Sequence, residues 1–207
     1  MSEATSQPNR IVWYSAAAGI VGPVLYTVTW LVLGFLDPTY SHTRDPISDL
    51  SAIGAPFAGI MTFIILVFAL LLVVFAYGLH RGLAPGFWGG PVALVIAAVG
   101  YAGIALAPLN LADLGDSNLP HTIAASVTVF ALMLAPLLLF PRLRRDPGWR
   151  NLSVYSIATT VAAFAFAILA SLPAFAGWEG LMQRLVLEVV LVWMVVIAIR
   201  LRASLRP

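Results

Sequence analysis

The sequence contains no cysteine and no lysine. Without cysteine there is no disulfide, thiol nucleophile, thiolate metal site or covalent c-type haem. Without lysine there is no amine for a retinal Schiff base, so a rhodopsin is excluded. All eleven basic residues are therefore Arg, and together with the abundant Ala, Gly and Pro this usage is typical of a GC-rich bacterial genome.

Charge is also scarce, because only 10% of the 207 residues are charged and 61% are hydrophobic. Soluble domains have about 45–50% apolar and about 25% charged residues. The mean hydropathy of +0.96 excludes an ordinary soluble domain, a disordered chain and a nucleic-acid binder. The length suits six membrane spans of about 20 residues each, with loops between them.

Six apolar segments are long enough to cross a bilayer as helices. Because they are continuously apolar rather than alternating, we expect helices and not barrel strands. We predict an all-α integral membrane protein, with residues 1–207 forming one polytopic domain of six transmembrane helices. The predicted spans are Ile11–Leu36, Pro56–Leu79, Gly89–Pro108, His121–Phe140, Leu152–Leu172 and Gln183–Leu201.

The distribution of Arg predicts the orientation. If the N-terminus is cytoplasmic, the cytoplasmic segments hold nine Arg residues and the outer segments only Arg44 and Arg184. This asymmetry follows the positive-inside rule. We therefore expect a multi-pass protein of the bacterial plasma (inner) membrane with both termini in the cytoplasm. The nine are Arg10, Arg81, Arg142, Arg144, Arg145, Arg150, Arg200, Arg202 and Arg206.

Most carboxylates and two of the three His residues fall on the predicted outer side. In the first outer loop, Asp45 before Pro46 fits the N-cap of a short interfacial helix from Pro46 to about Ala52. This helix would carry Ser48 and Asp49, which either point into a pocket or are solvated.

The remaining polar candidates lie where the fourth and sixth spans begin. His121 follows Pro120, and it is either a ligand-binding side chain or an interfacial residue bonded to a nearby carboxylate. Arg184 and Glu188 are four residues apart on one helix face, so an ion pair between them is the simplest expectation. A charge inside the membrane is also a candidate functional residue.

The clustering of these residues predicts a polar pocket in the outer leaflet that binds a membrane lipid or small amphiphile, with Arg184 on an anionic head group. The candidate residues are Ser48, Asp49, Asp113, His121, Arg184 and Glu188. An alternative is a metal-dependent membrane-embedded lipid hydrolase, with zinc held by His42, His121 and Asp113. A small-solute transporter using Glu188 is a further alternative. No nucleic-acid partner is expected, and the sequence leaves catalytic residues, other cofactors and the oligomeric state open.

Several stretches resemble a bacterial six-span membrane family known as domain of unknown function nine-nine-eight. They are the first-loop sequence RDPISDLSAIGAP, Asp113 with Pro120-His121 before the fourth span, GLMQRL at the start of the sixth, and Trp193 followed by Arg200-Leu201. The resemblance implies six helices and an outer polar cluster. The family has an acidic residue before the Arg of the last span, where this chain has Gln183. A more distant likeness is to seven-span ceramidase-type hydrolases, which hold zinc with three His, whereas this chain has only His42 and His121 outside.

Overall fold

The structure is a computed structural model that describes residues 10–113 and 115–205. Over these ranges it contains helices and no strand, which confirms the predicted all-α fold. The long helices are α1 (Arg10–Leu36), α2 (Ala58–Gly82), α3 (Gly89–Leu106), α4 (Leu119–Arg145), α5 (Arg150–Ala170) and α6 (Glu179–Ala203). The short 3-10 helices are η1 (Ile47–Ser51), η2 (Asp116–Asn118), η3 (Pro147–Trp149) and η4 (Pro173–Phe175).

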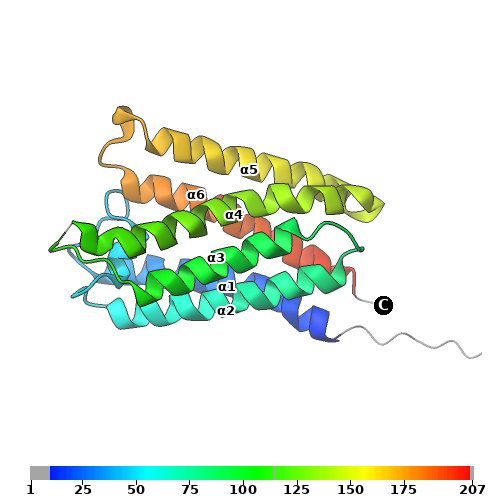
Figure 1. The fold of residues 1–207 in the computed structure, drawn as a ribbon, viewed down its shortest axis with the longest axis horizontal. Helices are drawn as coiled ribbons and strands as arrows, with labels where there is room; N and C mark the ends of the chain where they lie inside the picture. The colour runs from blue at the N-terminus through cyan, green and yellow to red at the C-terminus, as the bar shows by residue number, and fades with distance from the viewer. Residues whose placement is uncertain (1–9, 114, 206–207) are drawn as a thin grey trace, which may run out of the picture.

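The long helices form one elongated bundle in which each helix packs against the next along the chain (Figure 1). The bundle closes because α6 packs against α1 as well as α5. α6 also contacts α2 and α4, so it packs against four other long helices. A polar side chain on α6 is therefore placed to meet residues from distant parts of the chain.

Helices α1 to α5 are long and apolar enough to cross a membrane. Their outward faces carry large apolar side chains, such as Phe35, Phe63 and Val161, each more than 60% exposed. A bilayer accounts for this exposure, since lipid tails solvate such side chains and water does not. α6 has 25 residues, comparable in length, but it carries Arg184 and Glu188 in its first half. The chain is thus a multi-pass helical membrane protein.

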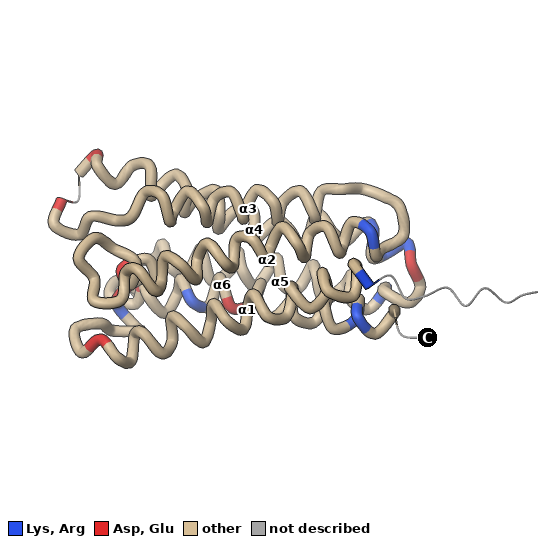
Figure 2. Tube along the Cα trace, turned by 90° about the horizontal axis from the view of Figure 1, so that it is seen from below, with Lys and Arg blue, Asp and Glu red and all other residues tan. Residues whose placement is uncertain are grey.

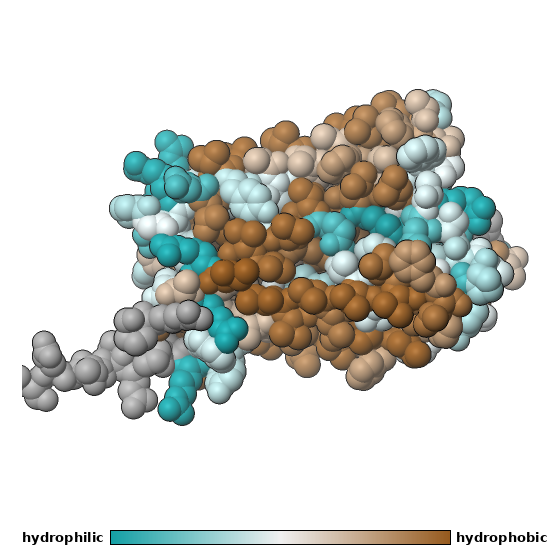
Figure 3. Space-filling view, turned by 180° about the vertical axis from the view of Figure 1, so that it is seen from behind, coloured by the Kyte–Doolittle hydropathy of each residue, from teal (hydrophilic) through white to brown (hydrophobic). Residues whose placement is uncertain are grey.

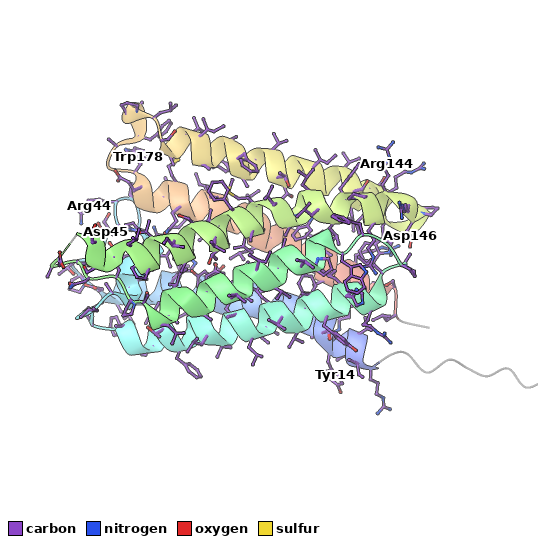
Figure 4. All side chains as sticks on the ribbon, in the orientation of Figure 1. Tyr14, Arg44, Asp45, Arg144, Asp146 and Trp178 are labelled. Atoms are coloured by element: carbon purple, nitrogen blue, oxygen red, sulfur yellow. The ribbon has the colours of Figure 1, made fainter. Side chains whose placement is uncertain are left out.

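The two ends of the bundle differ in charge. One end, here called the termini end, holds the start of α1 and the end of α6; the opposite end, the first-loop end, holds residues 37–57, 107–113, 115–118 and 171–178. Basic positions gather at the termini end and acidic positions at the first-loop end (Figure 2). Arg144 and Tyr14 lie at the former, and Arg44 and Trp178 at the latter (Figure 4). Arg206, one of the nine basic residues above, lies outside the described residues.

The first outer loop contains the predicted short helix, but its cap is not the predicted one. η1 spans Ile47–Ser51, and its N-cap is Pro46, which makes no side-chain hydrogen bond to the helix. The Asp45 carboxylate instead accepts hydrogen bonds from the Ser41 backbone N–H at 2.7 Å and from Arg44. The N-cap prediction was therefore wrong, because a local turn over residues 41–45 takes this carboxylate first.

Candidate functional site

The first outer loop folds over the beginning of α6. The carbonyls of Thr43 and Arg44 accept hydrogen bonds from the backbone N–H groups of Leu181 and Gly180 at 2.9 and 3.1 Å. These are among the N–H groups that a helix leaves unsatisfied in its first turn. A Cβ on Gly180 would lie 2.4 Å from the Asp45 carbonyl oxygen, so only glycine permits this approach. The loop thereby acts as the cap of α6 and covers the polar residues that follow.

Arg184 lies beneath this cap and is only 5% exposed. Its Nη1 donates to the Asp45 carbonyl at 3.0 Å, and its Nη2 donates to the Tyr40 hydroxyl. The guanidinium carbon lies 4.8 Å from the centre of the Trp30 ring, in a cation–π arrangement. Nε is buried and has no hydrogen-bond partner. Arg184 is thus held by a carbonyl, a hydroxyl and an aromatic face.

The expected ion pair between Arg184 and Glu188 is absent. Over residues 10–113 and 115–205, the one side-chain ion pair joins Arg44 to Asp45 at 2.7 Å. Arg184 turns toward the loop and donates to the Asp45 carbonyl there, whereas Glu188 turns toward α1 and accepts a hydrogen bond from Thr27 Oγ1 at 2.8 Å. The prediction of a pair was wrong because four-residue spacing permits contact but does not exclude stronger partners on other helices.

Glu188 lies at a groove between α1 and α6. The groove has a volume of about 300 Å³ and is lined by apolar side chains apart from Thr27 and Glu188. The Trp30 indole lies beside the same carboxylate, without a hydrogen bond of normal geometry. Figure 3 shows the face on which α1 and α6 lie, where a hydrophilic strip extends from the first-loop end into the apolar surface. The apolar lining residues are Pro23, Val24, Val28, Leu191, Val192, Val195 and Val196.

Ser48 and Asp49 are half-buried on η1. The Ser48 hydroxyl is 3.5 Å from Asp49 Oδ1, at the limit of a hydrogen bond. Burial raises the pKa of Asp49, the Asp45 carboxylate raises it further, and His121 and Arg184 act in the opposite direction. By contrast, the hydrogen bond from Arg44 holds the pKa of Asp45 below its usual value. Asp49 therefore lies within electrostatic range of both His121 and Arg184.

The second outer loop holds His121 and Asp113 apart. His121 is 5% exposed, and its Nδ1 lies 2.8 Å from the Ala107 carbonyl oxygen. Since a carbonyl only accepts, Nδ1 donates this hydrogen bond. Asp113 is exposed, and its carboxylate accepts from the Gly115 backbone N–H at 3.1 Å. His121 is accordingly an interior residue and Asp113 a turn residue facing solvent.

The three residues predicted to hold zinc lie in separate surroundings. His42 packs among the rings of Trp30, Phe35 and Tyr40, with the Phe35 centroid 4.6 Å away. A Cβ on Gly34 would lie 2.4 Å from His42 Cε1, so the imidazole rests directly on α1. Throughout the described residues, no three His, Asp or Glu side chains lie close enough together to hold a metal ion.

Several residues that build this region were not among those predicted from the sequence. Tyr40 joins the Arg184 guanidinium to the loop, because its hydroxyl also donates to the Pro46 carbonyl at 2.9 Å. The Asn118 side chain ties the second loop together through the Asn110 backbone. Tyr40 lies in the first outer loop, and Asn118 lies just before the helix-starting Pro120. Polar residues next to a predicted span boundary were the available signal.

The chain matches the family described as "Protein of unknown function (DUF998)" over residues 20–200. The chain belongs to the DUF998 family. No curated protein matches it, and no solved structure matches it. The match spans all six helices, although α1 and α6 extend beyond it at their outer residues.

The resemblance of this chain to the DUF998 family implied an acid where Gln183 stands. Gln183 Oε1 accepts a hydrogen bond from the Ile47 backbone N–H at 2.6 Å, so it anchors η1 to α6. A carboxylate can accept the same bond. Position 183 therefore serves to attach the first loop to α6 beside Arg184.

Proposed function

We propose that this protein binds a lipid or small amphiphile in the groove between α1 and α6. The observation that carries the proposal is an apolar groove of about 300 Å³ that faces the bilayer and has one carboxylate, that of Glu188, in its wall. Small-molecule sites have volumes of roughly 300–1,000 Å³ and few polar groups. A ligand with an aliphatic chain lying along the valines of the groove and a polar group at Glu188 matches this pattern.

The chemistry of Glu188 selects the polar group of the ligand. A carboxylate within hydrocarbon is costly and requires partners. Thr27 supplies one hydrogen bond, whereas an ionised carboxylate has about four acceptor sites. No basic residue lines the groove. We therefore assign to the ligand a hydrogen-bond donor, a hydroxyl or an amine, rather than the anionic head group expected from Arg184.

This assignment gives the six candidate residues different roles in the proposed site. Glu188 is the one that lines the groove. Arg184 holds the first loop over α6 and so fixes the helix that presents Glu188. Ser48 and Asp49 lie in the first loop and His121 lies at the start of α4, all at the first-loop end, and we propose them as polar residues of the outer mouth. Asp113 faces solvent.

The test is native mass spectrometry of the full chain purified from membranes in mild detergent. Glu188→Gln removes the charge and Val195→Trp fills the groove. Loss of a charge-assisted hydrogen bond costs about 1.5–3 kcal/mol, so we expect Glu188→Gln to retain about tenfold less amphiphile than the parent. We expect about the same tenfold loss for Val195→Trp, because its side chain occupies the groove. Val161→Trp, at an exposed site on α5 outside the groove, should retain the parental amount.

The groove assignment fails if Val195→Trp retains as much amphiphile as the parent. It also fails if Val161→Trp loses as much, because the loss would then be unrelated to the groove. Thermal unfolding of all variants identifies any that lose ligand by misfolding, and Val195→Ile, which adds one methylene, then serves as a milder replacement with the same expected direction.

We further propose that the protein lies in a bacterial plasma membrane with its termini end in the cytoplasm. The basic termini end supports this orientation, because positive residues remain preferentially on the cytoplasmic side. The α1/α6 groove then begins near the outer leaflet at Glu188 and extends toward the middle of the bilayer.

A further inference from the structure

A second pocket lies at the termini end, far along the bundle from Glu188. It occupies about 350 Å³ beside the connection between α2 and α3. His80, Arg81 and Arg142 line it, and its lining includes no acidic residue. Gly86 forms part of its floor, where an added Cβ would lie 3.6 Å from Arg145 Nη1, so a third Arg reaches the rim. The pocket is therefore strongly basic.

Arg142 is the buried centre of this pocket. It is 3% exposed. Its Nε donates to the Ala84 carbonyl at 2.6 Å, and its Nη2 donates to the carbonyls of His80 and Leu83 at 2.7 and 2.8 Å. These carbonyls belong to the last turn of α2 and the residues after it, where helix acceptors are left unsatisfied. Nη1 is buried and has no partner. Arg142, which lines the pocket, is thus a buried cation with one unpartnered nitrogen.

An apolar groove continues from this basic pocket along α2 and α3. It measures about 360 Å³, and its walls include Val73, Val92 and Val95. His80 and Trp88 line both the groove and the pocket, and their ring centroids are 4.6 Å apart. Trp88 is 62% exposed, which is usual for a Trp at the membrane–water interface. The two hollows therefore form one site with a basic head and an apolar stem.

We propose that this site binds an anionic phospholipid. The phosphate accepts hydrogen bonds from Arg81 and from the free Nη1 of Arg142, and one acyl chain lies in the groove between α2 and α3. Arg recognises phosphate through charge-assisted hydrogen bonds. The continuous apolar stem favours a lipid over soluble phosphate, because phosphate alone would leave the groove unused. Basic pockets between transmembrane helices are suited to such head groups.

The experiment titrates the purified full chain in mild detergent with phosphatidylglycerol or phosphatidylcholine and counts bound lipid by native mass spectrometry. We expect phosphatidylglycerol to bind at least fivefold more tightly than phosphatidylcholine. Arg81→Ala should weaken phosphatidylglycerol about fivefold, the effect of about 1 kcal/mol for one basic residue at the membrane surface. Val95→Trp, which fills the stem, should weaken both lipids. Arg142 is left intact because it also caps α2.

Two control variants test whether the loss of lipid binding is specific to the basic pocket and its groove. Arg144→Ala removes the same charge at the same end (Figure 4) from a residue that does not line the pocket, and it should bind phosphatidylglycerol like the parent. Val195→Trp in the α1/α6 groove should also leave this binding unchanged, so the two lipid sites are tested separately. Equal affinity for both lipids, or equal losses in Arg81→Ala and Arg144→Ala, overturns the proposal. Displacement of the lipid by millimolar inorganic phosphate overturns the choice of a lipid as the occupant.

Discussion

His42 is a half-buried base whose ring nitrogens are shielded from solvent. Both ring nitrogens are buried without hydrogen-bond partners, although the ring packs on three aromatic side chains. Burial lowers the pKa of His42 from its ordinary value of 6.5, and the nearby Arg184 lowers it further. Burial also raises the pKa of Tyr40 to about 12, so its hydroxyl stays neutral. A neutral imidazole is therefore the form that this fold prefers.

Protonation of His42 should destabilise the protein. Since the folded pKa lies below the unfolded one, the unfolded state binds the proton more readily, and stability falls as the pH drops through 6.5 toward the folded pKa. We expect the parent to melt at a lower temperature at pH 5.5 than at pH 8. His42→Phe keeps the aromatic packing and should reduce that difference, which melting curves in detergent at both pH values measure.

The other titratable groups contribute equally to parent and variant, so the change in pH dependence reports His42. Asp49 acts in the opposite direction, because its raised pKa makes protonation favour the folded state. An unchanged pH dependence in His42→Phe would show that the imidazole is not desolvated in the folded protein.

Helices α3 and α4 approach most closely at Gly100. A Cβ there would lie 2.1 Å from Thr128 Oγ1 and 3.0 Å from the Ala124 carbonyl oxygen. The Thr128 hydroxyl is already engaged, since it donates to the Ala124 carbonyl at 2.7 Å. Small residues allow helices to pack closely in lipid, where no hydrophobic effect draws them together. The contact between α3 and α4 therefore depends on the missing side chain.

Gly100→Ala should destabilise the bundle by about 1–3 kcal/mol, because the added methyl meets backbone that cannot move aside. Gly59→Ala provides the matched control, since an added Cβ on this α2 residue meets nothing within 4 Å. In that exposed helical position, Ala should stabilise by about 0.5–1 kcal/mol. Thermal melts of both variants in one detergent check the contrast. Equal effects of the two substitutions would contradict the close approach.

The boundaries of the helices could be predicted because the thickness of the bilayer sets their length. Ten of the twelve predicted starts and ends lie within three residues of the structure, but α6 begins at Glu179, before the predicted Gln183, and α4 continues to Arg145, beyond the predicted end at Phe140. The apolar run stops there, whereas the helix does not, because Arg142 donates hydrogen bonds to the carbonyls of His80 in α2 and of Ala84 just after it. A hydropathy pattern cannot reveal a charged side chain whose hydrogen-bond partners lie on another segment of the chain. The small-residue contact at Gly100 was likewise invisible without knowing which helices pack together.

At the scale of the whole molecule, the sequence predicted which end would be polar but not which side chains would meet. Thr27 and Glu188 are 161 positions apart, and Asp45 and Arg184 are 139 apart. Local spacing instead favoured a contact between Arg184 and Glu188, which does not form. The pairing of α6 with α1 decides these contacts, and no periodicity within one helix encodes it.

The orientation of the bundle can be tested directly because the chain has no cysteine. Ser171 and Ser204 are exposed at opposite ends, so one Cys at either position reports one side of the membrane. We expect a membrane-impermeant maleimide to label Ser171→Cys in intact spheroplasts and to label Ser204→Cys only after permeabilisation. The reason is the excess of Arg at the termini end, which the positive-inside rule places in the cytoplasm.

The reverse labelling pattern would reject this orientation and would have a consequence for the basic pocket. That pocket lies at the termini end, beside Arg81 and Arg142. The cytoplasmic leaflet is the one with the negative surface potential. A cytoplasmic termini end brings the basic pocket to the leaflet that supplies its proposed ligand, whereas the opposite orientation would face it away from that leaflet. The labelling experiment therefore tests the topology and one condition for the second lipid site at the same time.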